Sequence, residues 1–306
     1  EIPLRLVGSE MCIRDRLVTS LNHGAFFGLG SLVAASVVPR HKQASAVATM
    51  FMGLTIANVG GVPAATWLGQ VIGWRMSFAA TAVLGLVAML SLWFALPSGE
   101  AGRRPNVRHE LAVLKSPVVL LALLTTVLGA GAMFTLYTYI APTLADITGA
   151  SPAFITGMLV LIGLGFTLGN GLGGRMADRS LDGTLITFLV IVIIDLLAFP
   201  WIGQTSVGAA ISLLIFGVAT FAVVPPLQMG VMRAATDAPG LASSVNVGAF
   251  NLGNAVGAAA GGAVISAGLG YAAVPIAGAV IATAGLALVL VQRAANQRRR
   301  LAVQGC

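Results

Sequence analysis

Apolar runs of about 20 residues alternate with short polar connections along the chain. The runs fall at 17–38, 45–69, 74–96, 117–140, 153–174, 184–203, 206–230, 241–267 and 271–292. An α-helix needs about 20 apolar residues to cross about 30 Å of hydrocarbon, and no run has the strict alternation of an outer-membrane barrel strand. The pattern therefore predicts an all-α membrane protein with nine transmembrane helices.

The chain ends and one long connection interrupt this pattern. Residues 1–16 are polar and charged, and residues 6–16 resemble translated sequencing-adapter sequence. We therefore interpret 1–16 as a non-native tail, with a short native tail as the alternative. Residues 97–116 are polar and basic, as expected of a linker between two helical bundles.

Basic residues are distributed unevenly between the connections. Alternate connections, the linker and the C-terminal tail hold nearly all of them, whereas the opposite connections hold only Arg75. Cytoplasmic loops carry an excess of Lys and Arg. The linker and the C-terminus are therefore predicted to be cytoplasmic, in a multi-pass inner-membrane protein. The net charge of +7 reflects this topology rather than a nucleic-acid partner.

Composition supports the membrane assignment. Hydrophobic residues make up 57% and charged residues 9% of the chain, against about 25% charged in soluble domains. Cys12 and Cys306 lie near opposite ends and match no metal or redox spacing. No phosphate-binding glycine loop is present, so we expect no metal and no cofactor.

Small residues recur at a spacing of four, which places them on one helix face where membrane helices pack closely. The glycines on these faces are Gly53, Gly61, Gly165, Gly169, Gly173, Gly253, Gly257 and Gly261. They fall on the second, fifth and eighth spans, so the chain repeats in units of three helices. Transporters built from such units have four of them, and the missing unit is expected at the N-terminus.

Several segments resemble the major facilitator superfamily, in its twelve-helix drug:proton antiporter branch and its arabinose-efflux-permease-like members. They are 22–30, 53–63, 74–78, 174–179 and 246–262. The resemblance implies that the nine spans are family helices four to twelve of an N-terminally truncated chain. It assigns 17–96 to a remnant of the N-terminal bundle, 117–293 to the C-terminal six-helix bundle and 294–306 to a cytoplasmic tail.

The same resemblance implies a cytoplasmic gate. Gly174, Arg175, Asp178 and Arg179 match the second-half copy of the family's gating loop. They are expected to form a switching salt-bridge network, with plain positive-inside charge as the alternative. The family's antiporter signature ends in Gly-Pro, whereas 60–63 here read Gly-Gly-Val-Pro. This departure weakens the prediction of antiport from that segment.

Polar residues inside the spans are the candidates for a solute or proton pathway. Asp195 is the only acid within a span, and such residues are costly and commonly functional. His23 is a second proton-carrying candidate. The alternative for both is a hydrogen-bonded structural role. Uncharged candidates, for the pathway or for bonds between helices, are Asn58, Gln228, Asn246, Asn251 and Asn254. Tyr137 and Tyr139 are candidates for substrate contact, with a place in the interfacial aromatic belt as the alternative.

These observations favour a secondary active transporter. We expect a monomer that exports a small organic solute (a drug, sugar or metabolite) by alternating access, with protons as the driving ion. The first alternative is an inactive fragment of such a transporter. The second, a membrane-embedded enzyme, would need clustered His, Asp or Glu in the spans, and the sequence has none.

Overall fold

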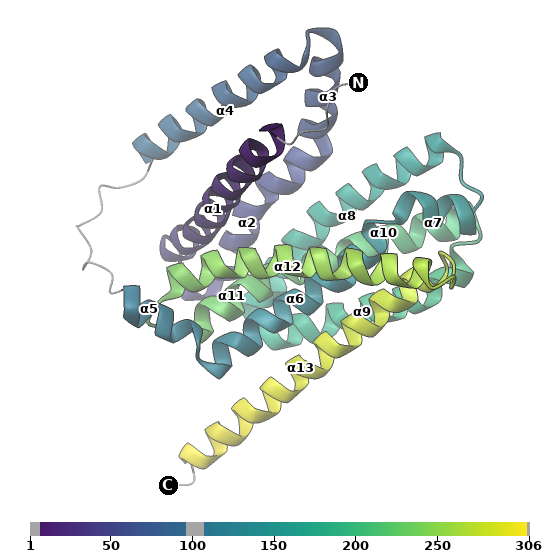
Figure 1. Ribbon diagram of the computed structural model, residues 1–306. Coiled ribbons are helices and arrows are strands. Elements are labelled where there is room, and N and C mark those ends of the chain that lie inside the picture. Colours follow the sequence, from purple (N-terminus) through teal and green to yellow (C-terminus); the bar gives the residue numbers. More distant parts are fainter. Residues whose placement is uncertain (1–6, 96–106, 305–306) are drawn as a thin grey trace.

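The computed structural model describes residues 7–95 and 107–304, all helical apart from short connections and with no strand in these ranges. The helices, drawn in Figure 1, are α1 (Val7–Ser36), η1 (Arg40–Lys42), α2 (Gln43–Ile56), η2 (Ala57–Gly61), α3 (Val62–Val71), α4 (Trp74–Ala95), α5 (Val107–Leu114), α6 (Pro117–Tyr137), α7 (Ile140–Ile147), α8 (Pro152–Arg179), α9 (Leu181–Ile202), α10 (Ser206–Ala222), α11 (Val224–Ala234), α12 (Pro239–Ser266) and α13 (Ala273–Gln304). The predicted all-α class is confirmed.

Seven helical stretches in the described chain are long and apolar enough to cross a membrane, counting α10 and α11 as one. The other two predicted spans are α12 and the continuous α2–η2–α3 rod. The 28-residue α12 is rich in Gly and carries three Asn, which lowers its hydropathy. The rod is interrupted by the five-residue π-helical turn η2, so neither of its flanking α-helices is long enough to span alone.

The short connections contain recognisable helix-start signals. Ser151 accepts a hydrogen bond from the Phe154 N–H, and Pro152 occupies the first turn of α8. Ser180 caps α9 in the same way through the Gly183 N–H. These caps satisfy backbone donors that have no partner inside the helix, so the chain reverses between spans without leaving those groups unpaired.

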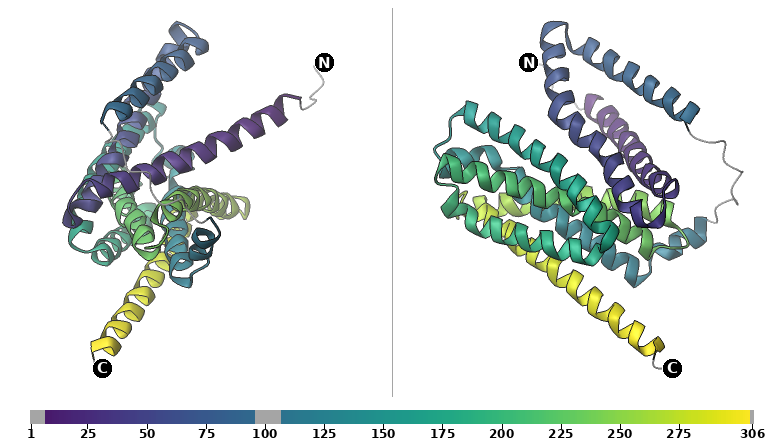
Figure 2. Two further views of the ribbon diagram at one scale, coloured as in Figure 1. Left: turned by 90° about the vertical axis from the view of Figure 1, so that its left-hand side faces the viewer. Right: turned by 180° about the vertical axis from the view of Figure 1, so that it is seen from behind.

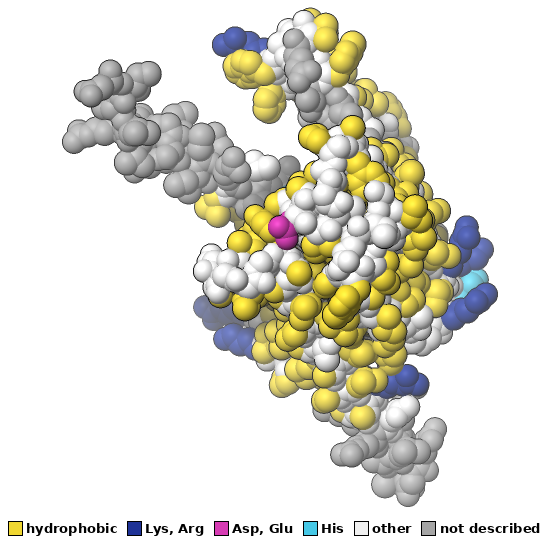
Figure 3. All heavy atoms as spheres, turned by 90° about the vertical axis from the view of Figure 1, so that its right-hand side faces the viewer, with side chains coloured by type: hydrophobic (Ala, Val, Ile, Leu, Met, Phe, Trp, Pro, Cys, Tyr) yellow, Lys and Arg dark blue, Asp and Glu magenta, His cyan; other side chains and the backbone are white. Residues whose placement is uncertain are grey.

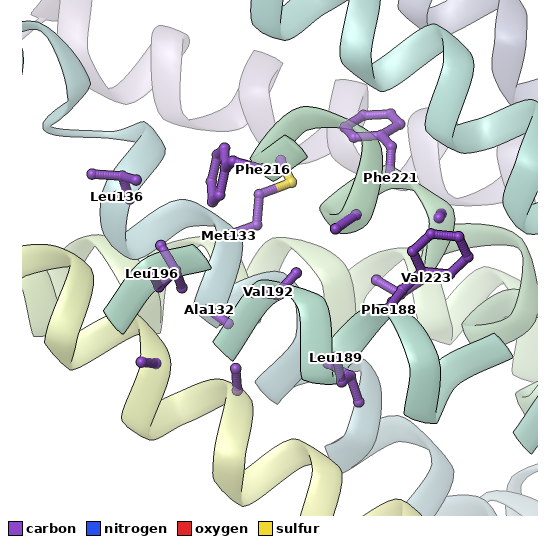
Figure 4. Close-up of a cluster of buried hydrophobic side chains, with 14 of the residues drawn as sticks. Ala132, Met133, Leu136, Phe188, Leu189, Val192, Leu196, Phe216, Phe221 and Val223 are labelled. Carbon is purple, nitrogen blue, oxygen red and sulfur yellow. The ribbon is translucent and has the colours of Figure 1, made fainter. Parts of the chain in front are cut away.

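The C-terminal helices, α6 to α13, form a bundle around one apolar core. α6 packs against α12 and α13, α8 against α10, and α9 against α10 and α13. Phe188, Phe216 and Phe221 lie in this core with Leu136 and Val192 (Figure 4). Buried apolar side chains of α6, α7, α8, α9, α10, α11 and α13 therefore hold this bundle together.

Six of the predicted packing glycines lie where these helices approach most closely. On α8, a Cβ added at Gly173 would lie 2.6 Å from the Ala222 Cα of α10. On α12, a Cβ at Gly257 would lie 2.9 Å from the Thr135 nitrogen of α6. Gly165, Gly169, Gly253 and Gly261 face equally close neighbours. In contrast, Gly53 has no described neighbour within 4 Å, and Gly61 meets only a side chain of its own rod.

The N-terminal helices, α1 to α4, lie along one side of the bundle. α1 packs against α12, and α2 packs against α8 and α11. The hairpin of α3 and α4 stands apart from the bundle in the right-hand view of Figure 2, and no residue of α4 is buried. The N-terminal and C-terminal helices therefore meet through α1 and α2.

The outer surface is predominantly apolar (Figure 3). Large exposed side chains include Phe78, Phe94, Trp93, Ile194 and Trp201. The coloured Lys and Arg side chains lie towards the edges of the face in Figure 3, away from its apolar middle. Lipid is the solvent that accommodates such a surface, so the chain is a multi-pass membrane protein.

The predicted domain boundaries differ in detail from the helix bounds. Helix α1 runs through the predicted junction at residue 17, and α13 extends into the predicted tail at 294–306. Residues 107–114 of the predicted linker form α5. Residues 1–6, 96–106 and 305–306, and the side chains of 7–16, lie outside what the structure describes.

Candidate functional site

A cavity of about 270 Å³ lies between the N-terminal and C-terminal helices. Helices α1 and α2 supply one wall, and α6, α8, α10, α11 and α12 supply the other. The lining residues are His23, Phe27, Phe51, Leu54, Gly129, Ala130, Met133, Phe134, Tyr137, Phe166, Thr220, Phe221, Val223, Val224, Val247, Phe250, Asn251 and Asn254. Its size is just below the roughly 300–1,000 Å³ usual for small-molecule sites.

Seven of the eighteen lining residues are Phe or Tyr, and several of these rings are paired within a wall. Phe27 of α1 stacks on Phe51 of α2 with ring centroids 5.5 Å apart. On the opposite wall, Phe166 of α8 stacks on Phe221 of α10 at 4.0 Å, and Tyr137 contacts Phe166 at 5.6 Å. The cavity is therefore bounded by an aromatic wall from each set of helices.

A few polar groups reach the cavity. His23 touches Phe27 through its ring and makes no hydrogen bond to any described residue. Asn254 likewise has no hydrogen-bond partner in the described chain, whereas Asn251 donates one N–H to the Val247 carbonyl at 2.8 Å. The amides of Asn251 and Asn254 and the imidazole of His23 thus retain hydrogen-bonding capacity for a solute. The cavity lining includes Tyr137, another predicted pathway residue.

Beside the cavity, Asp178 joins the two sets of helices. This residue, in the last turn of α8, accepts hydrogen bonds from the backbone N–H groups of Ala44 at 2.8 Å and Ser45 at 3.3 Å, and from the Ser45 hydroxyl. Those N–H groups open α2, where a helix carries partial positive charge. Asp178 therefore caps a helix of the opposite set. In this arrangement it forms no salt bridge with Arg175, Arg179 or any other described residue.

The same contact is close enough to require glycine. A Cβ added at Gly174 would lie 2.6 Å from the Ala48 Cβ and 3.1 Å from the Ala44 carbonyl. One turn earlier on α8, the Asn170 amide donates to the Ala48 carbonyl at 2.5 Å. Asn170 is fully buried. Asn170, Gly174 and Asp178, which are spaced by one helical turn along α8, thus all contact α2.

The contact of α8 with α2 through Asn170, Gly174 and Asp178 is the first of two closures between the sets of helices. The second closure joins α1 to α12 through a chain of buried polar groups. The Asn246 amide donates to Gln228 at 2.7 Å, the Gln228 amide donates to the Ser243 hydroxyl at 2.5 Å, and that hydroxyl donates to the Gly28 carbonyl of α1 at 2.9 Å. A Cβ added at Gly28 would lie 2.5 Å from the Ser244 Cα. Gln228 and Asn246 are therefore parts of this closure rather than of the cavity lining.

Both closures lie near connections that carry basic residues. Asp178 contacts the helix that follows Arg40 and Lys42, and Ser243 lies early in the helix that follows Arg233. These connections belong to the predicted cytoplasmic side. The two sets of helices are therefore in direct contact with each other on that side.

Two other candidates lie away from the cavity. Asp195 is 8% exposed inside the C-terminal bundle, where one carboxylate oxygen accepts from the Ser212 hydroxyl at 2.7 Å. Its other oxygen has no hydrogen-bond partner among the described residues. The Tyr139 hydroxyl donates to the Ala258 carbonyl at 3.0 Å, within the α6–α12 contact. The side chain of Asn58 lies outside the described residues.

Sequence reasoning missed the aromatic walls of the cavity and two polar residues of the closures, Asn170 and Ser243. Phe27, Phe51 and Phe166 resemble any other apolar residue of a membrane helix, and no spacing marks them. Asn170 and Ser243 lay in spans already identified, and Asn170, as a polar group beside Gly169, offered a usable signal. Only the pairing of distant helices shows what each one contacts.

The comparisons with known proteins agree with this architecture. The sequence pattern described as Major Facilitator Superfamily matches residues 11–257. The chain therefore belongs to the major facilitator superfamily. This membership confirms the predicted family.

Individual relatives give the scale of the similarity. The chain is 71% identical over 254 residues to the inner membrane transport protein YdhP of Escherichia coli K12, covering 83% of this chain and 65% of that protein. It is 34% identical over 255 residues to the putative transporter AraJ of the same strain, covering 83% and 64%. A chloramphenicol resistance protein of Streptomyces lividans is 34% identical over 246 residues, covering 79% and 63%. The chain thus spans slightly less than two thirds of these relatives.

Solved structures share the fold. The transporter FucP in its outward conformation superposes with a TM-score of 0.64 at 15% identity, covering 86% of this chain and 71% of that one. A human organic anion transporter superposes with a TM-score of 0.61 at 17% identity, covering 86% and 67%. At such identities the likeness concerns the fold alone.

Proposed function

We propose that the chain is the greater part of a secondary active transporter of the inner membrane that moves a small organic solute by alternating access. The observation that carries the proposal is the cavity lined by both sets of helices, together with the contacts that join these sets on the predicted cytoplasmic side. Separating α1 and α2 from α8 and α12 would open that side without unfolding either set. Rocking about a central site is the general mechanism of such transporters.

The closure contacts are strong enough to hold one state and weak enough to release it. A hydrogen bond to a charged group contributes about 1.5–3 kcal/mol, and a neutral one about 0.5–1.5 kcal/mol. Asp178 makes the charged bonds, while Asn170 and Ser243 make neutral ones across the same boundary. A solute or proton that binds the two states differently by a few kcal/mol is then sufficient to shift the equilibrium.

We further propose export driven by exchange with protons. This direction is supported by the resemblance to drug:proton antiporters and by the Streptomyces relative whose name refers to chloramphenicol resistance. His23 is the proton-carrying candidate in the cavity, where it faces the solute site. Asp195 is assigned a structural role because its carboxylate bonds to Ser212 inside the bundle instead.

Transport can be tested in everted membrane vesicles with a pH-sensitive dye that reports proton flux when solute is added. Two proteins are compared, namely the 306-residue chain and a chimera in which the N-terminal third of the 71%-identical relative precedes residue 17. The solutes are indole-3-acetamide, chloramphenicol and L-arabinose. Solute-dependent proton release by the chimera supports the proposal, and release lost in the His23→Gln chimera supports the proton assignment.

The comparison of the two proteins also separates the main alternative. Flux with the chimera but not with the chain alone would identify the chain as a part that needs further helices for transport. No proton flux with either protein, for any of the three solutes and with normal membrane insertion, would overturn proton-coupled transport of these solute classes.

A further inference from the structure

We infer that the cavity selects an uncharged aromatic solute carrying an amide-like or hydroxyl group, rather than a sugar or an organic ion. The inference rests on the proposed function, because it concerns the solute that the same cavity holds. It follows from three properties of the lining, namely its ring content, its lack of charge and the position of its free polar groups.

The ring content favours a flat aromatic solute. Phe27 and Phe51 approach from one set of helices, while Phe134, Phe166 and Phe221 approach from the other. Aromatic pairs adopt offset-stacked or edge-to-face arrangements and gain energy beyond that of the buried area. A planar solute between the two walls can contact rings from both sets of helices at once. Its binding would therefore depend on both sets, as a solute that controls their separation requires.

The lack of charge disfavours ions. No Lys, Arg, Asp or Glu occurs among the described residues that line the cavity. Burying an ionised group without an opposite charge is strongly unfavourable, and attraction of a cation to ring faces offsets only part of that cost. Asp195, the acid within the spans, lies outside the lining. While His23 is neutral, a carboxylate or an ammonium group would therefore find no opposite charge among the described lining residues.

The polar groups are few, and two of them lie on one helix. Asn251 and Asn254 are both on α12, His23 is on α1, Tyr137 is on α6, and Thr220, whose hydroxyl already donates to the Phe216 carbonyl, is on α10. The amide of Asn254 makes no hydrogen bond within the described chain, and the amide of Asn251 donates one N–H to the Val247 carbonyl. These groups can hydrogen-bond an amide or a hydroxyl of a solute. A monosaccharide carries a hydroxyl on nearly every carbon, and the hydroxyls that face the aromatic and aliphatic lining would be buried without partners.

The test measures binding to the purified 306-residue chain in nanodiscs, by calorimetry, with four probes. Indole-3-acetamide, indole-3-acetate and tryptamine share one ring system and differ in charge, and L-arabinose represents sugars. The amide should bind most tightly, with the acid and the amine at least tenfold weaker and no saturable binding of the sugar. Equal or tighter binding of the acid, the amine or the sugar would overturn the inference, as would absence of amide binding to a correctly inserted protein.

Substitutions locate the binding in the cavity. Phe27→Leu and Phe134→Leu each remove one ring from opposite walls and should weaken amide binding about three- to tenfold. Phe94→Leu is the matched control, since Phe94 is 83% exposed on α4 and away from the cavity. An equal loss in all three variants, or in none, would contradict the aromatic-wall assignment.

A second substitution tests the polar group without removing a ring. Asn254→Leu should reduce the preference for indole-3-acetamide over 3-ethylindole at least fivefold, because the amide loses its partner while the ring contacts remain. An unchanged preference excludes Asn254 from recognition.

The outcomes separate this inference from the proposed function. Selective amide binding without proton flux in the chimera would leave the inference standing and remove the proposed function. Proton flux with arabinose, without amide binding, would overturn the inference and leave the proposed function standing.

Discussion

Asp178 offers the sharpest test of the closure between the two sets of helices. Replacing it by Asn keeps the size of the side chain and one carbonyl oxygen for the Ala44 N–H, but removes the charge. A hydrogen bond to a charged group contributes about 1–1.5 kcal/mol more than a neutral one. Asp178 accepts its two shortest hydrogen bonds from the Ala44 N–H and the Ser45 hydroxyl. The lost attraction to the start of α2 adds about 0.3–1 kcal/mol.

The sum is about 2–4 kcal/mol, and the half-exposed position of Asp178 favours the lower end. Because 1.4 kcal/mol corresponds to a factor of ten, the population sealed on the cytoplasmic side should fall about thirtyfold relative to the open one. The bonds of Asp178 cross between the two sets of helices, so the unfolding temperature of either set should change little.

The populations can be measured as distance distributions between two spin labels. Labels at His41 and Asp182, which are exposed and belong to opposite sets, report the separation directly, after Cys12 and Cys306 are replaced by Ser. Asp178→Asn should move population from the shorter to the longer distance. The control is Arg175→Gln, which changes a charge on the same helix.

Two results would refute this reasoning. An unchanged distribution in Asp178→Asn would mean that the cap does not hold the closed state. A shift of equal size in Arg175→Gln would mean that net charge, rather than the cap on α2, controls the equilibrium.

Three further predictions follow from the close contacts and from the buried acid. Gly28→Ala should open the cytoplasmic side in the same spin-label assay, because the added Cβ would meet the Ser244 backbone; Gly53→Ala, which meets no described atom within 4 Å, should not. Gly169→Ala should lower the unfolding temperature in detergent, since its Cβ would overlap the backbone of α10 and overpacking costs about 1–3 kcal/mol; an unchanged temperature would argue against that contact. Asp195→Asn should leave amide binding within twofold of the parent protein, because its carboxylate does not line the cavity; a tenfold loss would return Asp195 to the solute pathway.

The local features of this protein could be predicted because they depend on neighbours in the sequence. In lipid the backbone hydrogen bonds must be made within the protein, so the all-α class and seven of the nine predicted spans follow from hydropathy alone. Close packing in lipid favours small residues four apart, and Gly173 and Gly257 lie in such contacts. Gly53 has the same spacing but no such contact among the described helices. Spacing therefore identifies a face that can pack, without identifying its neighbour.

The tertiary structure decided which polar and aromatic residues act together. Asp178 and Ala44 are 134 positions apart, and only the docking of α2 against α8 makes one the cap of the other. Asp195 and His23 look equally functional in sequence, yet one is buried against Ser212 and the other faces the cavity. The phenylalanines of the two walls carry no sequence signal, because an apolar ring satisfies lipid, core and cavity equally well. Hydropathy places a residue in the membrane, and only the packing of helices decides which of these three surroundings it occupies.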